Sequence, residues 1–177
     1  KSLKLLEEKN QNILSSIHYG ERIQHAILPL RERIQSFFPE HFILFKPRDI
    51  VSGDFYWFNK VDGKIILAVV DCTGHGVPGA FMSMLGISLL NEVLSTYGDR
   101  PTNEIMDEVR DQLIAALGQT GDKYEAKDGM DMALVAINTT NRTIQFTGAN
   151  QHLYTFQDGE LVVIKGDPMP VGIHAQS

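Results

Sequence analysis

Two aspartates in the sequence stand where an apolar run meets a glycine-containing turn. Asp71 closes the apolar run 64–70 and is followed by a Gly-x-Gly turn at 74–76, whereas Asp54 follows Gly53 and begins an aromatic run. Glycine lets a backbone carbonyl or amide approach a ligand closely, and a strand end holds its side chain at a fixed point. These positions therefore predict a functional site that contains both carboxylates.

The spacing of the two runs predicts that Asp54 and Asp71 lie close together. Residues 54–59 and 64–70 read as strands joined by the Asp-Gly dipeptide at 62–63, a frequent turn of β-hairpins. Antiparallel pairing then brings both aspartates to the same end of the hairpin. Neighbouring carboxylates repel unless a cation lies between them, and Mg²⁺ and Mn²⁺ prefer oxygen ligands. Asp54 and Asp71, with a backbone carbonyl, thus predict part of a divalent metal site.

Each of these residues also has an interpretation without chemistry. Asp54 follows a glycine, as in many turns, and Asp71 can cap the helix that follows it. Cys72 is a lone cysteine, a residue type that is more often a small buried hydrophobic group than a nucleophile. The sequence leaves three roles open for His75: a catalytic base, a metal ligand or a residue that orients the turn. No second histidine or cysteine lies at ligand spacing, so a zinc site is not expected.

A phosphate-binding turn is a further alternative. Gly74, Gly76 and Gly79 match the Gly-x-Gly-x-x-Gly pattern of dinucleotide-binding proteins. The strand before them belongs to a predicted hairpin rather than to a βαβ unit, and the acidic residue expected about twenty positions later falls within a predicted helix. We therefore rank nucleotide binding below metal binding.

The element that precedes the site is a predicted helix at 1–30. An apolar seam at coiled-coil spacing runs along its first half, contains a polar Asn10 typical of dimers, and fails at Gly20 and Gln24. The seam consists of Leu3, Leu6, Asn10, Ile13 and Ile17, and a stripe on a rotated face continues with Ile23, Ala26, Ile27 and Leu30. We expect the first half to pair with a second copy and the second half to dock on the domain. The alternative is a helix that is folded wholly onto its own core.

The rest of the chain predicts strands and helices in separate blocks. Strands are expected at 41–46, 54–59, 64–70, 131–138, 143–147, 152–156 and 160–165, and helices from 77 to a stop near 98 and over 102–117. Strands, two adjacent helices and further strands indicate an α+β fold rather than alternating βαβ units. We expect two antiparallel sheets that are flanked by helices.

The composition bounds the class of protein. The 177 residues are 43% hydrophobic and carry a net charge of -6 with a single cysteine, which indicates one globular domain, no disulfide and a cytoplasmic location. The acidic balance argues against nucleic-acid binding. No uninterrupted run of about 18 apolar residues predicts a membrane span. Because the sequence begins at Lys1 without methionine, we expect a fragment, with membrane contact only through a missing N-terminal sensor region.

Several stretches together resemble a known family. They are FKPRDIVSGDFY at 45–56 and AVVDCTGHGVPGAFM at 68–82, with weaker matches at 16–29, 128–134, 146–150 and 166–173. In this order and at this spacing they resemble the SpoIIE-type serine phosphatases, a bacterial branch of the metal-dependent PP2C (PPM) protein phosphatases. The resemblance implies a PP2C-like sandwich of two antiparallel sheets flanked by helices. It also implies a linker helix at 1–30 and a phosphatase domain at 31–177.

The resemblance assigns roles to individual residues. Asp71 matches the carboxylate that bridges two Mn²⁺ or Mg²⁺ ions, Asp54 matches the other acid, and Cys72 occupies the position whose backbone carbonyl is a ligand. His75 matches a residue beside the site, with a general-acid or orienting role, and Asp131 is either a further acid or only a strand-end residue. The implied reaction is hydrolysis of a phosphoprotein by a metal-activated water.

The resemblance also implies ligands that the sequence lacks. Family members carry an Asp-Gly pair and a final Asp after the segment that matches 168–173, so we expect a domain that is truncated at its C-terminus. The expected function is a metal-dependent serine/threonine protein phosphatase, the output domain of a bacterial signalling protein. The alternative is a phosphatase-like regulatory binding module with an incomplete metal site.

Overall fold

The structure is a computed structural model that describes residues 2–61, 63–98, 100–122 and 127–174. Its elements are α1 (Ser2–Ile27), α2 (Arg31–Gln35), β1 (Phe55–Val61), β2 (Lys64–Cys72), α3 (Gly76–Tyr97), α4 (Thr102–Ala116), β3 (Met130–Asn138), β4 (Thr143–Ala149), β5 (Leu153–Gln157) and β6 (Glu160–Ile164). Strands β1 to β4 form one antiparallel sheet in that order, and β5 and β6 form a second. The predicted α+β fold with two antiparallel sheets, flanking helices and an N-terminal helix is confirmed.

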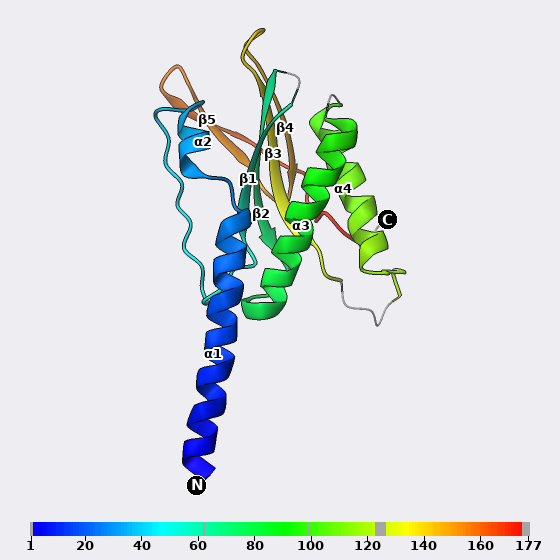
Figure 1. Ribbon diagram of the computed structural model, residues 1–177. Coiled ribbons are helices and arrows are strands. Elements are labelled where there is room, and N and C mark those ends of the chain that lie inside the picture. The colour runs from blue at the N-terminus through cyan, green and yellow to red at the C-terminus, as the bar shows by residue number, and fades with distance from the viewer. Residues whose placement is uncertain (1, 62, 99, 123–126, 175–177) are drawn as a thin grey trace.

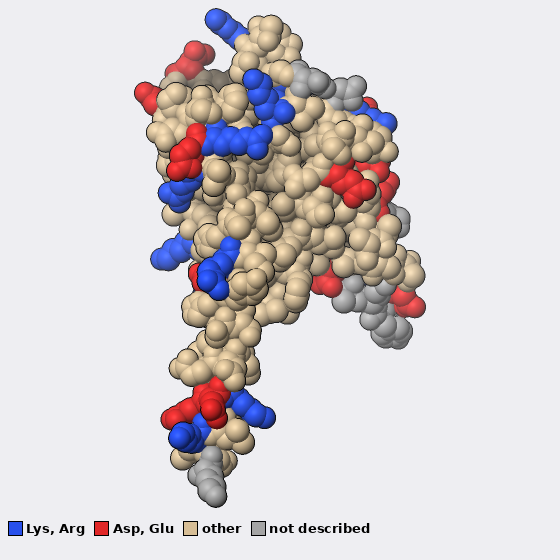
Figure 2. Space-filling model, viewed as in Figure 1, with Lys and Arg blue, Asp and Glu red and all other residues tan. Residues whose placement is uncertain are grey.

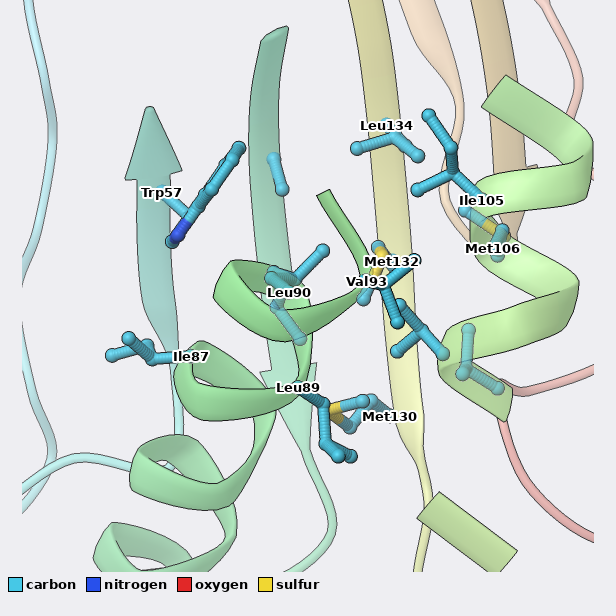
Figure 3. Packing of buried hydrophobic residues seen from close by; sticks show 14 of the residues in the cluster. Trp57, Ile87, Leu89, Leu90, Val93, Ile105, Met106, Met130, Met132 and Leu134 are labelled. Carbon is cyan, nitrogen blue, oxygen red and sulfur yellow. The ribbon is translucent and has the colours of Figure 1, made fainter. Parts of the chain in front are cut away.

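Helices α3 and α4 pack against one face of the large sheet (Figure 1). Side chains alternate across a strand, and those on this face, such as Trp57, Ile66 and Leu134, are at most 3% exposed. Figure 3 shows Leu90 and Val93 of α3 packed among them. Burying one such aliphatic side chain contributes about 1.5–3 kcal/mol. This core fixes the register of the strands that carry the candidate site.

Helix α3 is the one helix among the described residues that is long and apolar enough to cross a membrane by length and composition. Its apolar stretch is 56% buried within the protein, and Figure 3 shows its side chains directed at the sheet. Packing in the core therefore accounts for the apolar composition of α3.

The predicted strand at 41–46 is wrong, because these residues form no strand. The alternation that suggested it is real: Ile43 packs against the buried cluster that contains Phe58, whereas Phe42 and Leu44 are 90% and 85% exposed. A strand also needs a hydrogen-bonded neighbour, and this segment has none in the described part of the chain. The segment instead borders a cavity over the outer face of β1 and β2.

The N-terminal part of helix α1 projects away from the sheets and from the other helices (Figure 1). Near its free end, Leu3, Leu6 and Ile13 are 77%, 56% and 58% exposed. Gln24 is the buried residue of this helix. The alternative of a helix folded wholly onto its own core is therefore wrong.

The C-terminal half of α1 docks on the domain, but not through the predicted stripe. Ile23 and Ile27 of that stripe are 39% and 38% exposed, whereas Gln24 is 4% exposed. At 3.6 residues per turn, Gln24 lies on the same helix face as Ile13 and Ile17. The seam therefore continues onto the domain at the position where the sequence indicated that it failed.

The surface of α1 divides into a charged end and an uncharged stretch. No Lys, Arg, Asp or Glu lies between residues 10 and 20, and Figure 2 shows the charged side chains of the projecting part gathered near its tip. The uncharged stretch borders a groove of about 490 Å³, in which Ile13 and Ile17 face Val77 and Phe81 of α3. An unpartnered apolar surface thus runs from the helix onto the domain.

Candidate active site

The β1–β2 hairpin brings Asp54 and Asp71 together, as the sequence predicted. Phe55 pairs with Val70, so the two aspartates adjoin this pair at the same end of the hairpin. Burial, then the negative charge of Asp54 and a hydrogen bond with it, raise the pKa of the Asp71 carboxyl above its usual value. Each of these effects disfavours a second negative charge, so a bound cation would relieve the repulsion.

The backbone beside Asp54 is so close to the neighbouring turn that glycine is required at 53. A Cβ atom on Gly53 would lie 2.7 Å from the carbonyl oxygen of Gly74 and 3.4 Å from that of Cys72. Gly74 has a φ of 91°, a left-handed value that favours glycine. The turn therefore holds two backbone carbonyls against the segment that carries Asp54.

Cys72 has different surroundings at its thiol and at its carbonyl. The thiol lies in the core with 4% of the residue exposed, and burial followed by the charges of Asp71 and Asp54 raises its pKa to about 12. A protonated thiol is neither a nucleophile nor a metal ligand at neutral pH. The carbonyl oxygen lies beside Gly53, so it is the atom of Cys72 that can serve the site.

His75 is held by a residue that the sequence analysis did not single out. Its Nδ1 lies 2.9 Å from Oδ2 of Asp49, and the two side chains are 64% and 41% exposed. His75 directly precedes α3 but makes no side-chain capping hydrogen bond to it. Its ring is therefore oriented by Asp49 rather than by the helix.

Asp131 lies on the strand next to Asp71. The two residues are paired in the register of β2 and β3, and Asn150 Nδ2 donates a hydrogen bond of 2.9 Å to Asp131 Oδ1. This contact occupies one oxygen of the Asp131 carboxylate. Asp131 thus sits near the acid pair with an orientation set by Asn150.

Asp54 and Asp71 line a cavity of about 780 Å³ on the sheet face opposite α3 and α4. Leu67 and Val69 of β2 and the segment 40–46 form much of the remaining wall. Val69 is 61% exposed, so the cavity is open to solvent. His75 is not among the residues that line it.

The donor atoms fit a divalent cation in part. The carboxylates of Asp54 and Asp71 and the carbonyl of Cys72 are oxygen ligands of the kind that Mg²⁺ and Mn²⁺ take. Within residues 2–174, apart from the gaps at 62, 99 and 123–126, no three His, Cys, Asp or Glu side chains form a metal-binding group. These residues can therefore supply a part of the coordination shell of an ion.

Three contacts at the site were missed by the sequence analysis. They are the hydrogen bonds of Gln24 with Ser52, of Asp49 with His75 and of Asn150 with Asp131. One signal was available for the first of them, because Gln24 is a polar residue at a seam position that would otherwise be apolar. The other two join residues 26 and 19 positions apart, and no local pattern marks them.

Comparison with known proteins gives one family. The family model described as Stage II sporulation protein E (SpoIIE) matches residues 61–177. A search of the curated proteins gives no match.

Several solved structures are similar to the chain, among them the following two. The SiaA-PP2C domain of Pseudomonas aeruginosa has a TM-score of 0.81 and 34% sequence identity, over 93% of this chain and 64% of that one. RsbX in complex with magnesium has a TM-score of 0.53 and 15% identity, over 73% of this chain and 59% of that one, so it shows a shared fold alone. The chain thus spans less than two thirds of the length of either structure.

Proposed function

Because the chain belongs to the SpoIIE family of PP2C-type phosphatases, we propose that it hydrolyses phosphoserine and phosphothreonine in a protein substrate with Mn²⁺ or Mg²⁺. The PP2C-like fold and the SpoIIE domain support a serine/threonine phosphatase-type function. The observation that carries the proposal is the acid pair Asp54 and Asp71, whose repulsion a cation would relieve.

Asp54, Asp71 and Cys72 have complementary parts in this reaction. A pair of divalent ions, when bound, supplies a water of lowered pKa and neutralises charge on the phosphate oxygens. The two carboxylates and the Cys72 carbonyl hold the ions, and Gly53 keeps this backbone in contact with the turn. The Cys72 thiol stays protonated in the core, so it does not compete as a nucleophile.

His75 is the candidate proton donor. A serine or threonine oxygen leaves poorly as an alkoxide, so a nearby acid that protonates it speeds the reaction. Asp49 accepts a hydrogen bond from Nδ1–H of His75 and fixes the ring, which leaves Nε2 as the atom that transfers a proton. Asp49 is thus a positioning residue for His75.

The proposed activity is tested by phosphate release from a phosphoserine peptide by the full-length protein. Release is expected with Mn²⁺ or Mg²⁺ and is expected to stop when a chelator is added. The Asp71→Asn variant should be inactive, whereas Asp158→Asn, in the turn between β5 and β6, should retain activity. Near wild-type turnover of Asp71→Asn would contradict the proposed metal-bridging role.

A regulatory binding module with an incomplete metal site is the second candidate. It is favoured by the absence of a metal-binding group of three His, Cys, Asp or Glu side chains in the described parts of the chain. This candidate predicts that the full-length protein releases no phosphate with either ion. Metal-dependent release that is lost in Asp71→Asn would exclude it.

The remaining parts of the proposal concern the assembly. The protein is a homodimer paired through α1 and acts as the output domain of a cytoplasmic signalling protein. Residues 1–30 form the linker helix and residues 31–177 the phosphatase domain, with any membrane contact made by a separate sensor region. The exposed apolar side chains on the projecting half of α1 support the pairing.

A further inference from the structure

Gln24 is buried where the linker helix meets the domain. It is 4% exposed, and it is the buried residue of α1. Burying a side-chain amide costs free energy unless its polar atoms are hydrogen-bonded. The hydrogen-bond partners of the Gln24 amide therefore indicate which part of the domain this side chain holds in place.

The Gln24 amide pairs with the backbone of one residue. Its Oε1 accepts a hydrogen bond of 2.9 Å from the Ser52 backbone N–H, and its Nε2 donates to the Ser52 carbonyl oxygen at 2.7 Å. The second Nε2 hydrogen is donated to Ser83 Oγ of α3 at 2.8 Å. The side chain thus hydrogen-bonds to both the N–H and the carbonyl of Ser52, as a residue of a neighbouring strand would. Both of its amide hydrogens have acceptors.

A further hydrogen bond leads from Ser52 to Asp54. Ser52 Oγ accepts from the backbone N–H of Asp54 at 3.0 Å, and Ser52 is itself 4% exposed. On the other side of this segment, Gly53 lies against the carbonyls of Gly74 and Cys72. The backbone that carries Asp54 is therefore fixed between the α1 side chain and the turn.

We propose that Gln24 is a positioning residue that sets the place of the Asp54 carboxylate in the metal site. The inference rests on the proposed function, because it assigns Asp54 to that site. The Gln24 amide reaches Asp54 only through the Ser52 backbone and hydroxyl, so a displacement of α1 at Gln24 shifts the Asp54 carboxylate relative to Asp71. Residues that hold a metal ligand in place in this way change metal affinity about 10- to 100-fold when they are replaced.

The test uses Gln24→Met in the full-length protein, because methionine keeps the length and packing of the side chain and removes its hydrogen bonds. Two quantities are measured in each variant. They are the rate of hydrogen exchange at the Ser52 and Asp54 amides, and the affinity for Mn²⁺, obtained from the free Mn²⁺ signal in electron paramagnetic resonance. Ser52→Ala removes the hydrogen bond from the Asp54 N–H to Ser52 Oγ. It leaves the hydrogen bonds between Gln24 and the Ser52 backbone in place. The matched control is Thr102→Val, which removes the 2.8 Å hydrogen bond between the buried Thr102 of α4 and the partly exposed Thr147 of β4.

We expect Gln24→Met to speed exchange at both amides and to weaken Mn²⁺ binding about 10- to 100-fold. Ser52→Ala should weaken Mn²⁺ binding in the same direction, and Thr102→Val should leave it unchanged. Unchanged exchange, unchanged Mn²⁺ affinity, or an equal loss in Thr102→Val would each overturn the positioning role. Failure of the proposed function is a separate result, because the wild-type protein would then bind no Mn²⁺ before any residue is replaced.

Discussion

The Asp54–Asp71 pair predicts that one substitution stabilises the metal-free protein while it removes a carboxylate of the proposed metal site. In Asp71→Asn the side chain keeps its size and loses its charge, so the repulsion with Asp54 disappears. The pKa of Asp71 is raised in the folded protein by burial, by the Asp54 charge and by their hydrogen bond. Its ionisation at neutral pH therefore opposes folding, and the asparagine variant avoids that cost.

The size of the gain follows from the surroundings of the pair. Two unit charges about 4 Å apart interact with about 1 kcal/mol in bulk water and about 4 kcal/mol at an effective dielectric constant near 20. The two aspartates line an open cavity, so solvent screens them and we take about 1 kcal/mol. For a protein of this size, 1 kcal/mol corresponds to about 2–4 °C in Tm.

Thermal unfolding in a chelator measures this effect across pH. A raised pKa means that the folded state retains a proton which the unfolded chain releases, so wild-type stability falls as the pH rises above the usual carboxyl value of 3.8. The gain in Asp71→Asn should be full at pH 7 and shrink as the pH falls toward 3.8. The double variant with Asp54→Asn and Asp71→Asn should gain less stability than the sum of the two single gains, because either change removes the same repulsion. A lower Tm at pH 7, or a gain that persists in acid, would refute the reasoning.

Three further outcomes are expected. Ile13→Glu should make the protein monomeric by light scattering while the domain stays folded, because a charge enters an apolar pairing face. Tyr19→Glu on the opposite face should leave the mass of the dimer unchanged, and a wild-type monomer would contradict the pairing. Leu90 is 0% exposed, so Leu90→Ala should lower the free energy of unfolding, measured in urea, by about 2–5 kcal/mol. The exposed Leu161→Ala should lower it by about 0.5 kcal/mol or less, and equal losses would contradict the assignment of Leu90 to the core. Asp49→Asn should slow hydrolysis of a phosphoserine peptide more than that of an aryl phosphate, whose leaving group needs no proton. Equal slowing of the two substrates would contradict the role of Asp49 in positioning the proposed proton donor His75.

Elements with a local cause were predictable from the sequence. The hairpin of β1 and β2 follows from alternation on both sides of an Asp-Gly turn, and α3 from helix spacing with Gly98 at its end. The segment 41–46 has the same alternation, yet it forms no strand because pairing depends on a distant neighbour. Alternation reports which side chains are buried, whereas a sheet also requires backbone partners.

The candidate site was predictable to the extent that its residues are marked by turns and strand ends. Asp54 and Asp71 are brought together by one hairpin, so their proximity follows from a single turn. The supports of the site come from elsewhere in the chain: Gln24 reaches Ser52 across 28 positions, and Asp49 reaches His75 across 26. A sequence shows such residues only as exceptions to a pattern, as Gln24 is within the seam of α1.

Helix α1 physically connects the proposed pairing surface with the segment that carries Asp54. An isolated helix shorter than about 12–15 residues is marginal in water, and the first turn of α1 has no acidic residue to stabilise its N-terminus. Burial of its exposed leucines against a second copy would contribute about 1.5–3 kcal/mol for each side chain. Gln24 lies on the same face of the same continuous helix as Ile13, so the proposed pairing surface and the hydrogen bonds to Ser52 have a fixed relative orientation. If the protein pairs through α1 as proposed, a rotation or shift of the paired helices would act on the Asp54 backbone through Gln24.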